Sequence, residues 1–131
     1  MNRAVVCFGS NIDAHRNVAT VLELLAADFD LLARSDPEWT RPVGRSDQPD
    51  FLNGAVLLET SLDRDAVVEK LHAIEETLGR VRDPADPDGP RTMDLDVVVW
   101  NGQVVHDDYH NRPFVRRAVE QLREGDCSWE V

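Results

Sequence analysis

The clearest fold signal lies in residues 94–105, Asp94-Leu95-Asp96-Val97-Val98-Val99-Trp100-Asn101-Gly102-Gln103-Val104-Val105. Its first seven residues form a valine-rich run with the length of a strand. Asn101-Gly102 is typical of a two-residue turn, so the last three residues are expected to return alongside as a hairpin. Side chains at i and i+2 of a strand share a face, so Asp94 and Asp96 are predicted to project together while Leu95 enters the opposite face.

Two helices are predicted upstream, where apolar residues repeat at helical spacing. The first follows a turn at Gly9-Ser10-Asn11, and the second begins near Ser61 or Asp63 and ends at Gly79. The apolar stripes of the two helices are Val18, Val21, Leu22 and Leu25, and Val67, Leu71, Ile74 and Leu78.

The remaining segments complete the order β-α-β-β-α-β. Strands are expected at 4–8, 51–60 and 94–100, and in part of 29–39, where Asp36-Pro37 interrupts the run. The segments 41–50 and 80–91 are expected to be loops. A last helix is expected over 113–123. This order predicts one α+β domain over residues 1–131. Its expected form is a ferredoxin-like sandwich, an antiparallel sheet with two main helices on one face, plus a C-terminal hairpin and helix.

The charge balance limits the partners. Of 131 residues, 14 are Lys or Arg and 25 are Asp or Glu, which gives a net charge of −11. Such a surface repels phosphate backbones and anionic lipids, so nucleic acid and membranes are predicted not to be partners. The start shows no signal-peptide pattern, no run is long enough to span a bilayer, and Cys7 and Cys127 have the character of unpaired thiols. We expect a cytoplasmic protein, monomeric with an oligomer left open.

Acidic and basic side chains gather near residue 94. Asp94 and Asp96 repel each other unless a cation neutralises them, and Mg²⁺ carried in with substrate phosphates would do so; a merely hydrated sheet face is the alternative. Arg80, Arg82 and Arg91 surround the Pro-rich loop 80–91. Their guanidinium groups either form surface ion pairs or grip phosphate oxygens under a closing loop.

An aromatic and an amide stand two residues apart on the strand over 51–60. Phe51 and Asn53 therefore share a face and could stack on and hydrogen-bond a flat heterocycle. The alternative is that Phe51 is an ordinary core residue.

Four motifs occur in the order Phe8-Gly9-Ser10-Asn11, Asp47-Gln48-Pro49-Asp50-Phe51-Leu52-Asn53, Gly79-Arg80-Val81-Arg82 and Gly89-Pro90-Arg91-Thr92-Met93-Asp94-Leu95-Asp96. Together they resemble the 6-hydroxymethyl-7,8-dihydropterin pyrophosphokinase family over roughly residues 4–105. That family folds as a ferredoxin-like sandwich. The resemblance implies Mg²⁺-dependent transfer of the ATP diphosphoryl group to 6-hydroxymethyl-7,8-dihydropterin, releasing AMP, in folate biosynthesis. A pyrophosphokinase with another alcohol acceptor and a non-catalytic, pterin-binding or protein-interaction descendant are the alternatives.

The resemblance also implies roles for individual residues. Asp94 and Asp96 would hold two Mg²⁺ ions, and with Arg82 and Arg91 they form the implied catalytic group. The implied ATP-binding residues are His72, Glu75, Arg80, Arg82, Arg91 and Arg112, and the implied pterin-binding residues are Thr40, Pro42, Val43, Phe51, Asn53 and Phe114.

Three departures from the family pattern stand out. Pro87 and Asp88 occupy the loop position where the family usually has an aromatic or basic residue. His106 and His110 are both candidates for a family histidine that contacts ATP. The usual C-terminal extension is largely absent, so we expect a short member of the family.

Overall fold

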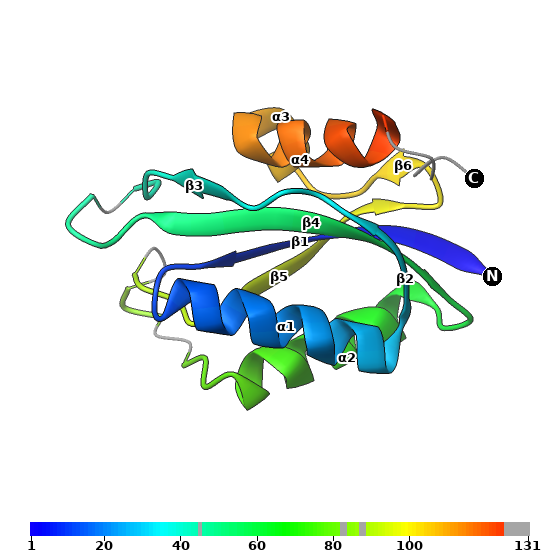
Figure 1. Cartoon of the computed structure of the whole chain (residues 1–131), viewed down its shortest axis with the longest axis horizontal. Helices are drawn as coiled ribbons and strands as arrows, with labels where there is room; N and C mark the ends of the chain where they lie inside the picture. Colours follow the sequence, from blue (N-terminus) through cyan, green and yellow to red (C-terminus); the bar gives the residue numbers. More distant parts are fainter. Residues whose placement is uncertain (45, 82–83, 87–88, 125–131) are drawn as a thin grey trace.

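The computed structural model describes residues 1–44, 46–81, 84–86 and 89–124, and its elements follow the predicted order (Figure 1). Among these residues, no helix has both the length and the apolar character needed to cross a membrane. The elements are β1 (Asn2–Ser10), α1 (Ala14–Asp28), β2 (Asp30–Arg34), β3 (Glu38–Thr40), β4 (Phe51–Thr60), α2 (Arg64–Thr77), β5 (Asp94–Trp100), β6 (Gln103–Val104), α3 (Asp108–Asn111) and α4 (Pro113–Glu124).

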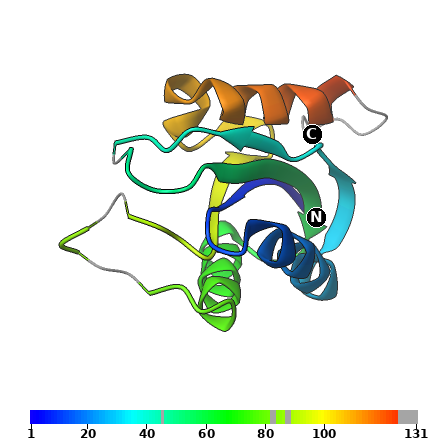
Figure 2. The ribbon, with the colours of Figure 1, turned by 60° about the vertical axis from the view of Figure 1, so that its left-hand side comes forward.

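The strands form one sheet in the order β2-β4-β1-β5-β6. The short strand β3 pairs with the first residues of β4, and β2 pairs with residues farther along β4. Every pairing is antiparallel. Helices α1 and α2 cover one face, and α3 and α4 lie on the other (Figures 1 and 2). The predicted ferredoxin-like sandwich with an appended hairpin and helix is therefore confirmed.

The core has two layers because β1 sends alternate side chains to opposite faces of the sheet. Val6 and Phe8 join the apolar cluster beneath α1 and α2. Val5 joins the other cluster, in which Val119 of α4 covers the sheet. Central strands buried on both faces explain why their sequences are continuously apolar rather than alternating.

Helix α4 is tied to the segment around β3 by polar contacts. Arg117 donates two hydrogen bonds to the Glu38 carboxylate, at 2.6 and 3.3 Å. The Asp36 backbone N–H donates to Gln121 Oε1 at 2.7 Å, and Gln121 Nε2 donates to the Asp36 carboxylate at 3.1 Å. These contacts fix α4 against the edge of the sheet that carries β3.

The turns and caps follow the sequence closely. Asn101 and Gly102 have φ values of 47° and 79°, as the predicted two-residue hairpin turn requires. Helix α2 begins after Asp63, whose side chain accepts from the Ala66 N–H, and ends before Gly79 at φ 84°. The short helix α3 was not predicted, because four residues are too few to produce a periodic pattern.

The register of the central strands sets up one polar row. Gly9 of β1 lies between Asn53 of β4 and Asp94 of β5, and Cys7 lies between Ala55 and Asp96. A Cβ at Gly9 would stand 2.5 Å from the Asn53 amide oxygen, so only glycine fits beneath this row. Residues that are far apart in the sequence thus meet on the α4 face.

Candidate active site

A cavity of about 420 Å³ opens on the α4 face of the sheet, over β1, β4 and β5. Its walls come from the segment after β3, from the loop that precedes β5 and from the start of α4. It collects predicted residues from both implied substrate sites: Thr40, Val43, Phe51, Asn53, Arg80, Arg91, Asp94, Asp96, Arg112 and Phe114.

One end of this cavity carries aromatic and amide groups. Phe51 lines the cavity and belongs to neither apolar core cluster. Phe114 lines the same cavity from the first turn of α4. Asn53 and Thr40 line it as well, and Asn53 Nδ2 donates a hydrogen bond to Thr40 Oγ1 across the β3–β4 pair. Two aromatic faces and an oriented amide suit a flat, polar-edged ring.

The other end carries guanidinium and carboxylate groups. Arg80 and Arg91 donate to opposite oxygens of Asp94, at 3.0 and 3.1 Å. The Arg80 side chain is only 11% exposed, and it also donates to the buried Glu75 carboxylate. Glu75 accepts a further hydrogen bond from the Leu95 backbone N–H at 2.8 Å, which anchors this group to β5.

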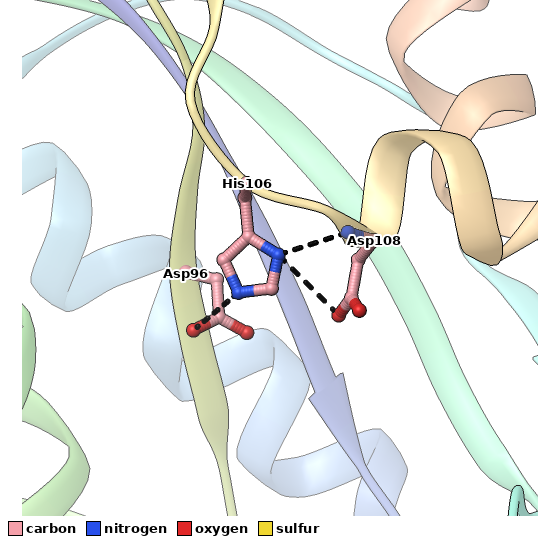
Figure 3. A group of neighbouring side chains, drawn as sticks. All are labelled: Asp96, His106 and Asp108. Atoms are coloured by element: carbon pink, nitrogen blue, oxygen red, sulfur yellow. Dashed lines mark hydrogen bonds and ion pairs between the residues drawn. The ribbon is translucent and has the colours of Figure 1, made fainter.

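Asp96 has different surroundings from Asp94. Among the described residues no guanidinium reaches it, and the basic side chain beside it is His106, with Nε2 3.7 Å from Asp96 Oδ1 (Figure 3). Burial, and then the neighbouring Asp94, raise the pKa of Asp96 to about 6. Asp96 is therefore the acidic group of the pair that most lacks a cation.

The structure brings His106, rather than His110, to the aspartates. The Asp108 backbone N–H donates to His106 Nδ1 at 3.1 Å, so the other ring nitrogen faces Asp96. His110 instead lies edge-on to Tyr109, with ring centroids 5.2 Å apart. Asp108, which the sequence analysis did not single out, lines the cavity as a third carboxylate.

Cys7 also lines the cavity, on β1 opposite Asp96 of the neighbouring strand β5. Burial, followed by the negative charges of Asp96, Asp108 and Asp94, raises the pKa of the Cys7 thiol far above its usual range. Cys7 therefore stays protonated and is a poor nucleophile.

A second cavity, of about 300 Å³, lies between α2 and β5. Asp96 lines both cavities, so the two adjoin at this residue. The predicted nucleotide residue His72 lines the second cavity, together with His106. The apolar part of the lining is Val68, Leu71, Leu95, Val97 and Val105.

Asn11 links the two loops that border the larger cavity. Its backbone N–H donates to the Arg91 carbonyl at 3.1 Å, and the Arg91 N–H donates to Asn11 Oδ1 at 2.8 Å. Its Nδ2 donates to Gln48 Oε1 and to the Pro49 carbonyl, at 2.8 and 3.1 Å. The sequence analysis quoted this asparagine in a turn and in the first of the four motifs, and gave it no role of its own.

Two predicted residues of the described chain, Glu75 and Pro42, line neither cavity. Glu75 lines neither cavity, because its carboxylate is directed into the interior toward Arg80 and Leu95. Pro42 lies between the lining residues Arg41 and Val43 but is not itself part of the lining. Arg82 lies outside the described residues. The roles predicted for Glu75, Pro42 and Arg82 stay predictions.

Comparison with known proteins adds an independent finding. Residues 5–124 match the family described as 7,8-dihydro-6-hydroxymethylpterin-pyrophosphokinase. The chain is 40% identical to the 2-amino-4-hydroxy-6-hydroxymethyldihydropteridine pyrophosphokinase of Methylorubrum extorquens over 111 residues, or 82% of this chain and 69% of that relative. Proteins of the same name from Bacillus subtilis and Haemophilus influenzae are 36% and 30% identical, over 92% and 88% of this chain and 78% of each relative.

Proposed function

This chain belongs to the 7,8-dihydro-6-hydroxymethylpterin-pyrophosphokinase family, and we propose that it transfers the diphosphoryl group of ATP to the primary alcohol of 6-hydroxymethyl-7,8-dihydropterin, releasing AMP. The product would serve folate biosynthesis. The observation that carries the proposal is the larger cavity, which joins a heterocycle-binding end to an end that carries arginines and aspartates.

The aromatic end of the cavity supports recognition of the pterin. Phe51 and Phe114 offer two ring faces, and the Asn53 amide is oriented by its hydrogen bond to Thr40. A pterin is flat and carries donors and acceptors along its edge, so stacking and edge recognition would hold it together. Its hydroxymethyl group would then be directed toward the aspartates.

The second cavity supports a site for the nucleotide. Its apolar walls suit a purine base, and His72 and His106 add polar groups at its rim. The triphosphate of a nucleotide bound in this cavity would extend past Asp96 into the larger cavity. There the guanidinium groups of Arg80, Arg91 and Arg112 could donate hydrogen bonds to the phosphate oxygens.

The residues fit Mg²⁺ as the metal of this reaction. Asp94 and Asp96 project from one face of β5, and Asp96 has no guanidinium partner within the described part of the chain. Oxygen ligands of this kind suit Mg²⁺ shared with substrate phosphates. When bound, Mg²⁺ would neutralise phosphate charge and make the pterin alcohol easier to deprotonate.

The protein's own contribution would be positioning and charge. Arg80 and Arg91 are already ordered by Asp94, so little conformational entropy is lost when phosphates arrive. Phosphoryl transfer needs no covalent enzyme intermediate, and the protonated Cys7 thiol beneath the site is not suited to form one. The arginine guanidinium groups would stabilise the negative charge that develops on the phosphate oxygens during transfer.

The test is AMP release from ATP and Mg²⁺, with and without 6-hydroxymethyl-7,8-dihydropterin, with the diphosphorylated pterin identified by mass spectrometry. Phe51→Ala and Asn53→Ala should raise KM for the pterin at least tenfold and leave KM for ATP nearly unchanged. Trp39→Ala removes an aromatic that is 50% exposed and lies outside the cavity, so it serves as the matched control.

Two outcomes would count against this proposal. The first is AMP release that does not depend on the pterin. The second is calorimetric binding of the pterin without binding of ATP in the presence of Mg²⁺, which would identify a non-catalytic binding protein.

A further inference from the structure

Three side chains meet where the two cavities adjoin: Asp96, His106 and Asp108. Each offers a ligand atom, and these atoms lie within 4.8 Å of one another. Figure 3 shows the imidazole of His106 between the two carboxylates. We propose that Asp96 and His106 bind a transition-metal ion of the Zn²⁺ or Co²⁺ type, with Asp108 orienting the imidazole from its far side.

The gap between Asp96 and His106 has the size that such an ion needs. Their facing atoms, Oδ1 and Nε2, are 3.7 Å apart, which is longer than a hydrogen bond. Zinc bonds to nitrogen and to carboxylate oxygen are about 2.0–2.2 Å long, so two ligands at a tetrahedral angle are separated by about 3.4 Å. Only a small side-chain adjustment separates the observed spacing from that value.

Asp108 supplies the support that metal-bound histidines usually have. Its carboxylate oxygen Oδ2 lies 3.7 Å from His106 Nδ1, and its backbone N–H now donates to that nitrogen. An ion on Nε2 displaces the proton there, and the ring then carries its proton on Nδ1. The Asp108 backbone N–H would then have to turn away from Nδ1, and its carboxylate would have to move within hydrogen-bond distance to accept the proton, which gives a carboxylate–histidine–metal arrangement.

Charge and ligand type indicate which ion the site prefers. Asp94 is paired with two arginines, whereas among the described residues the only basic side chain within ion-pair distance of Asp96 is that of His106. The chain carries a net charge of −11, which raises the local concentration of cations. An imidazole ligand favours Zn²⁺, Co²⁺ or Ni²⁺ over Mg²⁺, which prefers oxygen. The site therefore differs in ligand set from the oxygen-bound Mg²⁺ of the proposed reaction.

The position of the ion has a consequence that rests on the proposed function. Asp96 lies on the route between the cavities, so an ion held by Asp96 and His106 would occupy the path of the triphosphate. Zn²⁺ should therefore inhibit AMP release in competition with Mg²⁺-bound ATP.

Metal binding itself is tested without nucleotide or pterin, so its outcome is independent of the activity. We would titrate the purified protein with Co²⁺, followed by visible absorption, and with Zn²⁺, followed by calorimetry. One ion per chain should bind, and His106→Gln should weaken binding at least tenfold. Asp108→Asn should weaken it by roughly 10- to 100-fold, the usual effect of losing such a partner.

The controls are His110→Gln and His72→Gln, which remove the histidine beside Tyr109 and the other histidine of the second cavity. Both should bind Co²⁺ like the wild type, and Zn²⁺ should shift the His106 ring resonances in NMR spectra of the wild type. Absence of Co²⁺ and Zn²⁺ binding by the wild type, or equal binding by His106→Gln, overturns the proposal. Circular dichroism establishes that each variant is folded.

Discussion

Replacing Glu75 by glutamine tests the buried network that holds Arg80 beside Asp94. The Glu75 side chain is only 3% exposed and accepts hydrogen bonds from the Arg80 guanidinium and from the Leu95 backbone N–H. Glutamine keeps the shape and one carbonyl acceptor but loses the negative charge. The Arg80 side chain, 11% exposed, then keeps only Asp94 as a charged partner among the described residues.

The expected loss follows from the hydrogen bonds and the charge. Removing one member of a buried ion pair outright costs about 3–5 kcal/mol, because the other charge stays buried. The second partner, Asp94, reduces that cost. Arg80 and Leu95 donate to the same Glu75 oxygen, so the carbonyl of glutamine can keep both hydrogen bonds, but a neutral acceptor weakens them below the value of about 1.5–3 kcal/mol that a hydrogen bond to a charged group is worth. We therefore expect Glu75→Gln to lower the free energy of unfolding by about 2–3 kcal/mol, which corresponds to a fall in Tm of roughly 10 °C for a domain of this size.

Urea unfolding followed by circular dichroism measures this loss. Glu76→Gln is the matched control, because it makes the same chemical change at the next position of α2, where the side chain is exposed. It should alter the free energy of unfolding by less than about 0.5 kcal/mol. Equal stabilities of the Glu75→Gln and Glu76→Gln proteins would refute the idea that this buried carboxylate organises the site.

Three further predictions concern single residues. The pKa of Asp96 is raised to about 6, so between about pH 4 and pH 6 the folded protein retains a proton that the unfolded chain has lost, and stability falls as the pH rises. Asp96→Asn without divalent metal should therefore be more stable than the wild type at pH 7 in urea unfolding, with a gain that disappears near pH 4; a constant gain contradicts this. The raised pKa of Cys7 predicts alkylation by iodoacetamide at pH 8 at least tenfold slower than for free cysteine, measured in a variant whose other cysteine is serine. Asn11→Asp keeps the acceptor for the Arg91 N–H but removes the donor to Gln48. Amide hydrogen exchange should therefore become faster around residues 47–50, while the Arg91 amide stays protected. Unchanged exchange at both places argues against the idea that Asn11 links the two loops.

The fold was predictable because each element carries its own local signal. Helical spacing, the Asn101-Gly102 turn and the proline-rich loops all depend on neighbours within a few residues. The packing of the last helix on the second face of the sheet was not predicted in that detail. It depends on the continuously apolar strands that face the helix, such as the strand containing Val5, which shares an apolar cluster with Val119 of α4. Local patterns do not show which face of a doubly buried strand meets which helix.

The site was predictable in its composition but not in its pairings. The spacing of Asp94 and Asp96 indicated a shared face, yet nothing local showed that one would be neutralised by arginines and the other would face a histidine. That difference depends on Arg80 reaching Asp94 across fourteen residues of chain. The choice between His106 and His110 likewise depends on a four-residue helix that leaves no periodic trace.

The larger cavity acquires one of its walls only from α4, the last helix of the described chain. During synthesis, the sheet strands leave the ribosome before that wall exists, and residues such as Val5, Leu57 and Val99 stay uncovered on that side of the nascent domain. Docking of α4 therefore buries these apolar side chains and completes the larger cavity in a single event. A newly made chain gains its protection from aggregation and its binding competence at the same moment.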